Sequence, residues 1–82
     1  MNENKIQTQK LNPAEYVISQ FGGVRATARA IGYVPTNISK WRHQGNGRIP
    51  TSVQELILDK ADEMGLDVTP RDLIKGREVS YE

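Results

Sequence analysis

The sequence predicts an all-α fold, a compact domain of four to five helices. Apolar residues recur at i, i+3, i+4 and i+7, which is the spacing of one helix face. A capping residue or proline precedes several of these stretches and a glycine follows them, as at helix ends. With one Trp, three Tyr, one Phe and no Cys in 82 residues, the chain lacks the aromatics of a large β-sandwich core and any disulfide. These features predict a single small domain that relies on helix packing.

The first helix is predicted to begin at Asn12, a side-chain cap, with Pro13 at its first helical position. Gly22 ends it, because glycine accepts the left-handed backbone of a helix C-terminus. Residues 1–11 are polar and lack periodicity, so a flexible N-terminal tail is expected there. The apolar stripe of this helix consists of Ala14, Val17, Ile18 and Phe21.

Two shorter helices are expected next, over residues 24–30 and 35–42, with Gly32 and Pro35 between them. Gly32 stops the first, and Pro35 begins the second, since an N–H in the first turn has no helical partner to lose. The expected inner faces are Val24, Ala28 and Ile31 in one helix and Val34, Ile38 and Trp41 in the other.

A loop over residues 43–49 precedes the longest predicted helix, 51–64. A hairpin at Asn46-Gly47 is the alternative, but the flanking residues do not alternate between apolar and polar. A capping box of Ser52 with Glu55, or of Thr51 with Gln54, is expected at the helix start. The core stripe of this helix is Val53, Leu56, Ile57, Ala61 and Met64.

A last short helix is predicted after Thr69-Pro70, with Asp72 as the acid of a capping box and Gly76 as its end. Residues 77–82 are expected to form a flexible C-terminal tail. The sequence therefore predicts one folded domain over residues 12–76.

The charge is divided along the chain, although the formal net charge is only +1. Between Tyr16 and Gln54 there is no Asp or Glu, and five Lys and Arg residues give a balance of +5. From Glu55 onward eight acids oppose four cations, a balance of −4. Chance clustering on a solvated surface is one explanation. The other is a half that faces a polyanion and a half turned away from it.

The residues around the predicted bend have the pattern of a helix-turn-helix. Ala28 is small where two steeply crossing helices would touch, Gly32 allows the bend, and Ile38 and Trp41 return to the core. At about 100° per residue, the opposite side of helix 35–42 is polar and basic. It carries Thr36, Lys40 and His43, flanked by Asn37 and Ser39. In a helix-turn-helix this outer face enters the DNA major groove, whereas an ordinary amphipathic surface helix would leave it to solvent.

The same stretch resembles the DNA-binding core of Cro-type phage repressors, especially the all-helical Cro branch and YdaS-like prophage regulators. The resemblance covers about residues 14–75. It is carried by Phe21-Gly22-Gly23, Ala28, Ile31-Gly32, Ile38-Ser39, Trp41, Gly47-Arg48-Ile49-Pro50 and Val68-Thr69 followed by Leu73. It implies a lambda-repressor-like architecture and a sequence-specific, double-stranded DNA-binding repressor in the cytoplasm of a bacterial host cell, nucleoid-associated when bound. Val34-Pro35 departs from the family pattern, which has polar residues at that place.

Roles for single residues follow from this interpretation. Lys40 is the first candidate for a guanine contact, with a phosphate contact as the alternative, and Asn37 is suited to adenine. The expected base-contacting set is Thr36, Asn37, Ser39, Lys40 and His43. The expected phosphate-contacting set is Arg25, Arg42, Gln44, Asn46 and Arg48, which would fix docking without carrying sequence information. Trp41 is expected in the core and not as a base-stacking platform.

A homodimer is expected, at least on DNA, because a small helix-turn-helix domain binds two half-sites about one helical turn apart. Apolar residues left over from the helix stripes would form its interface: Leu58, Leu66, Val68 and Ile74. A protein-binding module of the antitoxin or antirepressor type, acting through the acidic C-terminal half, is the alternative function. The sequence predicts no enzyme activity, cofactor, metal or membrane partner, since it lacks a catalytic constellation, a metal-ligand cluster and a long apolar run.

Overall fold

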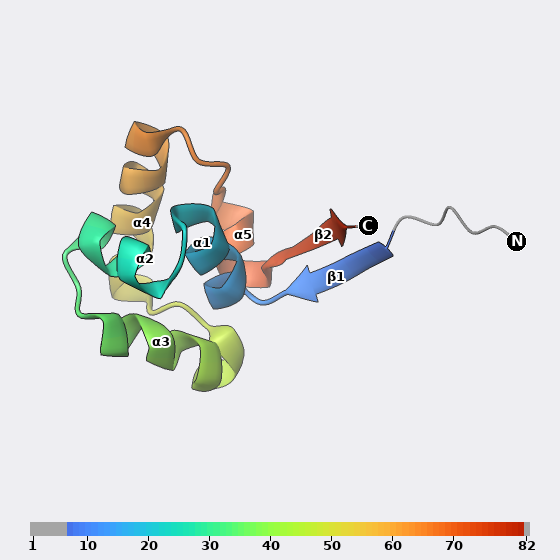
Figure 1. Ribbon diagram of the computed structural model, residues 1–82, viewed down its shortest axis with the longest axis horizontal. Coiled ribbons are helices and arrows are strands. Elements are labelled where there is room, and N and C mark those ends of the chain that lie inside the picture. The colour runs from blue at the N-terminus through green and yellow to red at the C-terminus, as the bar shows by residue number, and fades with distance from the viewer. Residues whose placement is uncertain (1–6, 82) are drawn as a thin grey trace, which may run out of the picture.

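The computed structural model describes residues 7–81 (Figure 1). In this range five α-helices form a compact body, and two strands form a ribbon that projects from it. The helices are α1 (Pro13–Phe21), α2 (Val24–Ile31), α3 (Pro35–His43), α4 (Thr51–Met64) and α5 (Pro70–Lys75), with a 3₁₀ turn η1 (Gly45–Gly47) after α3. The strands are β1 (Gln7–Leu11) and β2 (Arg77–Tyr81). A mostly helical domain is therefore confirmed, with helix boundaries within one residue of those expected.

The ribbon is the main departure from the expected all-α class. β1 and β2 pair antiparallel, with Gln7 opposite Tyr81 and Leu11 opposite Arg77. Both segments were expected to be flexible tails, and that expectation was wrong for 7–11 and 77–81; residues 1–6 and 82 lie outside the described range. The two strands lie about seventy residues apart in the chain, so the sequence contains no hairpin-turn signal that would predict their pairing.

Gly76 lets the ribbon attach to the helical body. Its backbone has φ 72° and ψ −163°, a region that is essentially restricted to glycine. A Cβ at this position would lie 2.0 Å from the carbonyl oxygen of Leu11. The strand β2 can therefore turn away from α5 and pass directly against the end of β1 only because this residue has no side chain.

The core gathers at least one buried apolar residue from every helix and from the segment before α4. It consists of Ala14, Val17, Ile18, Phe21, Ala28, Ile31, Ile38, Trp41, Ile49, Val53, Ile57, Ala61 and Leu73. The stripe predicted for α1 is buried in full, together with Tyr16 beside it. The apolar spacing thus located the core faces of the helices correctly.

Two residues expected in the core are exposed. Val34 is 56% exposed because it lies before α3 in an extended conformation, where helical spacing does not apply. Met64 is 52% exposed because it occupies the last position of α4, beyond Ala61, the last buried residue of that helix.

The helix starts were predicted with unequal success. Asn12 caps α1, and Thr69 with Asp72 forms the capping box expected for α5. The capping box expected for α4 is wrong, because Pro50 is the capping residue and offers no side-chain acceptor. Gln54 instead donates from Nε2 to the carbonyl oxygen of Ile49, at 3.2 Å.

A polar network, here called the Arg77 network, joins distant parts of the fold; its members are Tyr16, Asp67, Thr69, Asp72 and Arg77. Arg77 forms a bidentate hydrogen-bonded ion pair with buried Asp72, donating from Nε to Oδ1 at 2.9 Å and from Nη2 to Oδ2 at 2.7 Å. Thr69 donates to the same carboxylate from its backbone N–H, at 2.8 Å, and from its hydroxyl, at 3.0 Å. Burial raises the pKa of Asp72, but the hydrogen bonds from Arg77 and Thr69 outweigh it and hold the pKa below its usual value.

The other side of Arg77 faces α1 and the segment between α4 and α5. Its Nη1 lies 2.6 Å from Oδ2 of Asp67, and its guanidinium carbon lies 4.6 Å from the centre of the Tyr16 ring. The Tyr16 hydroxyl donates to the backbone oxygen of Asp67, at 2.6 Å. One residue of β2 therefore connects β2 with α1, α5 and the segment between α4 and α5.

Replacing Gly76 by alanine tests the close approach of the strands. Gly65→Ala is the matched control, because Gly65 also has a positive φ, of 70°, but no atom lies within 4 Å of an added Cβ. Gly65→Ala should cost about 1–2 kcal/mol for the left-handed backbone alone. Gly76→Ala should lower the free energy of unfolding further, by at least about 1 kcal/mol, in urea denaturation. Equal losses would show that the contact with Leu11 is unimportant.

The pH dependence of stability tests the Arg77 network. The folded-state pKa of Asp72 lies below its unfolded-state pKa of about 3.9. Its contribution is therefore fully present above that unfolded-state value and is lost as the pH falls through the folded-state pKa. Arg77→Met removes the Arg77 hydrogen bonds that lower this pKa, so stability near neutral pH should fall by about 1.5–3 kcal/mol, and the difference from the parent should shrink as the pH falls and Asp72 is protonated in both proteins. Arg71→Met removes an exposed cation of the same helix region and is the control. Urea denaturation of Arg77→Met, Arg71→Met and the parent at pH 7 and at pH 3 measures this, and a deficit of Arg77→Met that stayed the same at both pH values would contradict the assignment.

Candidate nucleic-acid interface

The connection between α2 and α3 is three residues long and begins at Gly32. Gly32 has φ 78° and ends α2, and its N–H donates to the carbonyl oxygen of Ala28, at 2.8 Å. The N–H of Tyr33 donates to the same oxygen, at 2.9 Å. Ala28 is buried, with 2% of its surface exposed. A buried small residue in α2 and a left-handed glycine at its end thus lie where the sequence pattern placed them.

The inner face of α3 is held down by two core residues. Ile38 is fully buried, and Trp41 is 7% exposed. The ring of Tyr33 meets the Trp41 ring edge to face, with 6.2 Å between ring centres and 63° between planes. Trp41 is therefore a core residue, as expected. Tyr33 is a contact that the sequence analysis missed, and its position directly after Gly32 is the only sequence signal for it.

The outer face of α3 carries most of the expected base-contacting residues. Thr36, Asn37, Lys40 and His43 are exposed. Ser39 is half-buried, and its hydroxyl accepts a hydrogen bond from Nη2 of Arg42, at 3.4 Å. Four of the five predicted residues are therefore exposed to solvent on α3, and the fifth, Ser39, forms a hydrogen bond within the helix. The burial of Ile38 and Trp41 fixes which face of α3 points outward.

A shallow hollow of about 300 Å³ lies beside this face. It is lined by Tyr33, Asn37, Lys40, Trp41, Gln44 and Pro50. Asn37 and Lys40 supply polar groups at the lining, while the aromatic rings supply an apolar side. The hollow is open to solvent and brings the end of α3 next to the start of α4.

The expected phosphate-contacting residues surround α3 on neighbouring segments. Arg25 lies in the first turn of α2, Arg42 in the last turn of α3, and Arg48 follows η1; all three are exposed. Gln44 and Asn46 are exposed between them, and Asn46 has a left-handed backbone with φ 59°. Within residues 7–81, none of the cations on α2, on α3 or at Arg48 forms an ion pair. Their charge is therefore available to an external anion.

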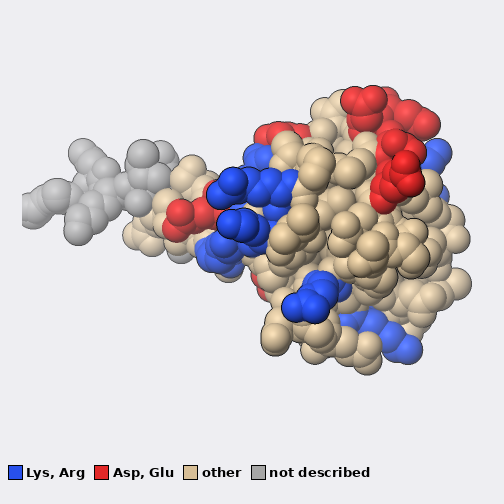
Figure 2. Space-filling view, turned by 180° about the vertical axis from the view of Figure 1, so that it is seen from behind, with Lys and Arg blue, Asp and Glu red and all other residues tan. Residues whose placement is uncertain are grey.

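The basic and acidic parts of the sequence lie in different parts of the structure. No acid lies between Tyr16 and Gln54, which covers α2, α3 and η1 completely. Figure 2 shows the largest group of acids at the end of the body where α4 ends, while Lys and Arg lie over the α3 region and, with single acids among them, near the ribbon. The outer face of α3 is thus free of local repulsion toward a polyanion.

The residues expected at a dimer interface have different surroundings. Leu58, Leu66 and Val68 are partly buried and pack against the core of their own chain. Ile74 is 69% exposed, on α5. The first three therefore have a role within the single chain, and Ile74 alone remains largely open to a partner.

No helix within 7–81 is long and apolar enough to cross a membrane. The described part of the chain also holds no group of three or more His, Cys, Asp or Glu side chains placed to bind a metal ion. His43, the single histidine, is exposed at the end of α3.

Truncating Trp41 tests whether it fixes the orientation of α3. Trp41→Ala should lower the free energy of unfolding by about 3–5 kcal/mol, because a buried ring is removed and a cavity remains. Tyr33→Ala is the control, since Tyr33 touches Trp41 but is itself exposed. It should cost much less in the same thermal or urea denaturation. A loss of similar size in both variants would mean that the aromatic pair, and not burial of Trp41, holds α3.

Comparison of the chain with protein-family models, with curated proteins and with solved structures gave no match. What the surface can bind therefore follows from its own chemistry. That chemistry is a helix face of small polar groups and one lysine, fixed by two buried residues and surrounded by arginines, in a segment of the chain that contains no acid.

Proposed function

We propose that this protein is a sequence-specific double-stranded DNA-binding transcriptional regulator, a Cro-like repressor that binds a short operator. The observation that carries the proposal is the outer face of α3, which is exposed, basic and free of acids while Ile38 and Trp41 anchor its inner face. In this proposal α2 and α3 act as a helix-turn-helix, and α3 is the helix that enters the major groove.

The dimensions and chemistry of α3 fit such a role. A helix with its side chains is about 10–12 Å wide, close to the 12 Å width of the major groove of B-DNA. Lys40 can donate to the O6 and N7 acceptors of guanine, and Asn37 can pair with adenine. Thr36 offers a hydroxyl to a base or phosphate and a methyl group to thymine.

Pro35 shapes the specificity of the first turn. Its side chain has no donor or acceptor, so at this place it can contribute only van der Waals contact. Val34 precedes it and is 56% exposed. The leading tip of α3 is therefore apolar, which suits contact with a thymine methyl group and leaves hydrogen bonding to the next turn.

The arginines around α3 suit the phosphate backbone. Arg25, Arg42 and Arg48 lie on three different segments, so together they would fix the position and angle of α3 on the duplex. Contacts of this kind add affinity for every sequence and make binding depend on salt. The proposal thus separates base contacts on α3 from anchoring contacts around it.

The repressor is proposed to act as a dimer on two half-sites. Two copies of α3 would then meet successive turns of the major groove, about 34–36 Å apart. Exposed Ile74 lies outside the α3 surface and is available to such a contact. Sedimentation that showed one copy of the chain both free and on its operator would remove the dimer from the proposal.

Selection of duplexes from a random pool is the experiment that tests the function. It should enrich one motif, with two related half-sites about 10–10.5 base pairs apart. If no motif emerged and affinity stayed at about 10⁻⁴–10⁻⁶ M for all duplexes, the repressor proposal would fail. Binding to a protein through the acidic half would then be the better explanation.

Two single substitutions test the division of roles. Lys40→Ala should cost about 1–3 kcal/mol on the selected motif and relax the preference at one position. Arg48→Ala should weaken binding to all sequences alike and reduce the slope of log K against log salt by about one. Titrations at several salt concentrations, on the motif and on a scrambled duplex, separate the two effects. If both variants changed specificity and salt slope in the same way, the assignment of base contact to Lys40 and of phosphate contact to Arg48 would be wrong.

A further inference from the structure

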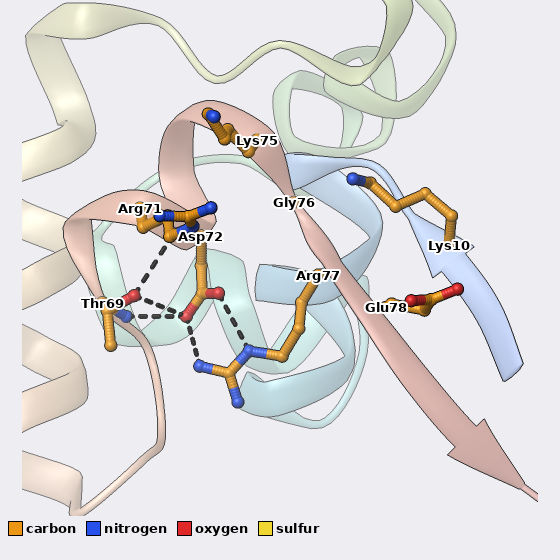
Figure 3. A pocket seen from close by; sticks show the side chains of 8 residues that line it. All are labelled: Lys10, Thr69, Arg71, Asp72, Lys75, Gly76, Arg77 and Glu78. Atoms are coloured by element: carbon orange, nitrogen blue, oxygen red, sulfur yellow. Dashed lines mark hydrogen bonds and ion pairs between the residues drawn. The ribbon is translucent and has the colours of Figure 1, made fainter.

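A second group of cations lies where the ribbon joins the helical body. Lys10 from β1 and Arg71 and Lys75 from α5 line one hollow of about 320 Å³ (Figure 3). These three residues are called the ribbon-base cluster. All three are exposed. They come from opposite ends of the chain, so no sequence window contains them together.

The acids in the hollow do not neutralise this cluster. Asp72 accepts hydrogen bonds from Arg77 and Thr69, and it is buried (Figure 3). Glu78 lies opposite Lys10 in the strand register, and one of its oxygens accepts from the Thr8 hydroxyl at 3.1 Å. Among residues 7–81, no ion pair involves a member of the ribbon-base cluster. Three cations therefore face one acid that is not already paired with an arginine.

The fold brings the cluster together at a definite place. Lys10 lies beside α5 because β1 pairs with β2 and because Gly76 admits the carbonyl of Leu11. Gathering like charges costs electrostatic free energy, which a bound polyanion would offset. The ribbon-base cluster is therefore expected to be more stable with an anionic partner bound than when it faces only solvent.

Cations at the base of the ribbon and cations near α3 are visible on one face of the molecule. Figure 2 shows Lys and Arg side chains crowded where the ribbon meets the body and again over the α3 region, on the same visible side. The largest group of acids lies at the upper end of the body, away from α3, and single acids lie near the ribbon.

We propose that the ribbon-base cluster is a second phosphate-contacting surface, which binds the duplex backbone outside the segment that α3 contacts. The inference rests on the proposed function of α3 and adds new binding residues to it. Lysine and arginine that contact phosphates extend the footprint and strengthen binding without changing the preferred sequence. The ribbon then has a function of its own, which is to hold Lys10 at this surface.

The test compares salt dependence in matched variants of the full chain. Lys75→Ala should reduce the slope of log K against log salt by about 0.9, and Lys10→Ala/Lys75→Ala should reduce it by about twice that value. Lys60→Ala removes the same charge from α4, where Lys60 pairs with Glu63, and should leave the slope unchanged. The motif selected from a random pool should be the same for all three variants and the parent chain.

Duplex length supplies a second measurement. Removing the base pairs that flank the selected motif should weaken binding of the parent chain and leave binding of Lys10→Ala/Lys75→Ala almost unaltered. If the double variant fails to give the parent's circular dichroism spectrum, Lys10→Gln/Lys75→Gln replaces it in both measurements.

The outcomes separate the two proposals. If the parent chain binds its motif and Lys75→Ala behaves like Lys60→Ala, the ribbon-base cluster is overturned while the role of α3 stands. If Lys40→Ala has no effect but the cluster variants lower affinity for every duplex, the role of α3 fails and the cluster stands. If the parent chain binds no duplex above the non-specific level, both fail. Binding to phosphatidylserine vesicles that depended on Lys75, with duplex binding unaffected, would also overturn the cluster proposal.

Discussion

The contact between Arg77 and Asp72 holds together the parts of this fold that helix packing alone would leave separate. Asp72 is buried, and a buried carboxylate is unfavourable without partners. Arg77 supplies two hydrogen bonds to it and at the same time reaches Asp67 and the ring of Tyr16. Because Arg77 is also the first residue of β2, satisfying Asp72 fixes where that strand begins. The direction of the ribbon and the position of Lys10 at its base both depend on this contact.

The basic surface depends on a different part of the core. Ile38 and Trp41 fix α3 against the body, and the short turn at Gly32 fixes α3 against α2. The two arrangements meet at α1, which contributes Tyr16 to the Arg77 network and the stripe from Ala14 to Phe21 to the core. Helix α1 therefore acts as the common support for the ribbon on one side and for the α2–α3 pair on the other.

Local signals in the sequence predicted most of the helical body. Asn12 and Thr69 mark helix starts because a capping side chain acts within three residues, and the apolar stripe of α1 follows from helical spacing alone. The same spacing predicted that Thr36 and Lys40 would face outward, whereas their contact with DNA stays a prediction. The ribbon, the contact of Arg77 with Tyr16 and the hollow shared by Lys10 and Lys75 were not predicted, because each joins residues that approach one another only through tertiary packing. Val34 and Met64 were misplaced because helical spacing was extended past the residues where it holds.

The long separation of the two strands has a consequence for the basic surface. Bringing β1 to β2 closes nearly the whole chain into a loop, and a two-stranded ribbon offers little burial in return. Packing of α1 against α5 closes most of that loop, so the ribbon is favourable where these two helices are packed together. Lys10 and Lys75 therefore line one hollow only where α1 and α5 are packed and the ribbon is paired, so the full basic surface is a property of the folded domain and not of either end of the chain.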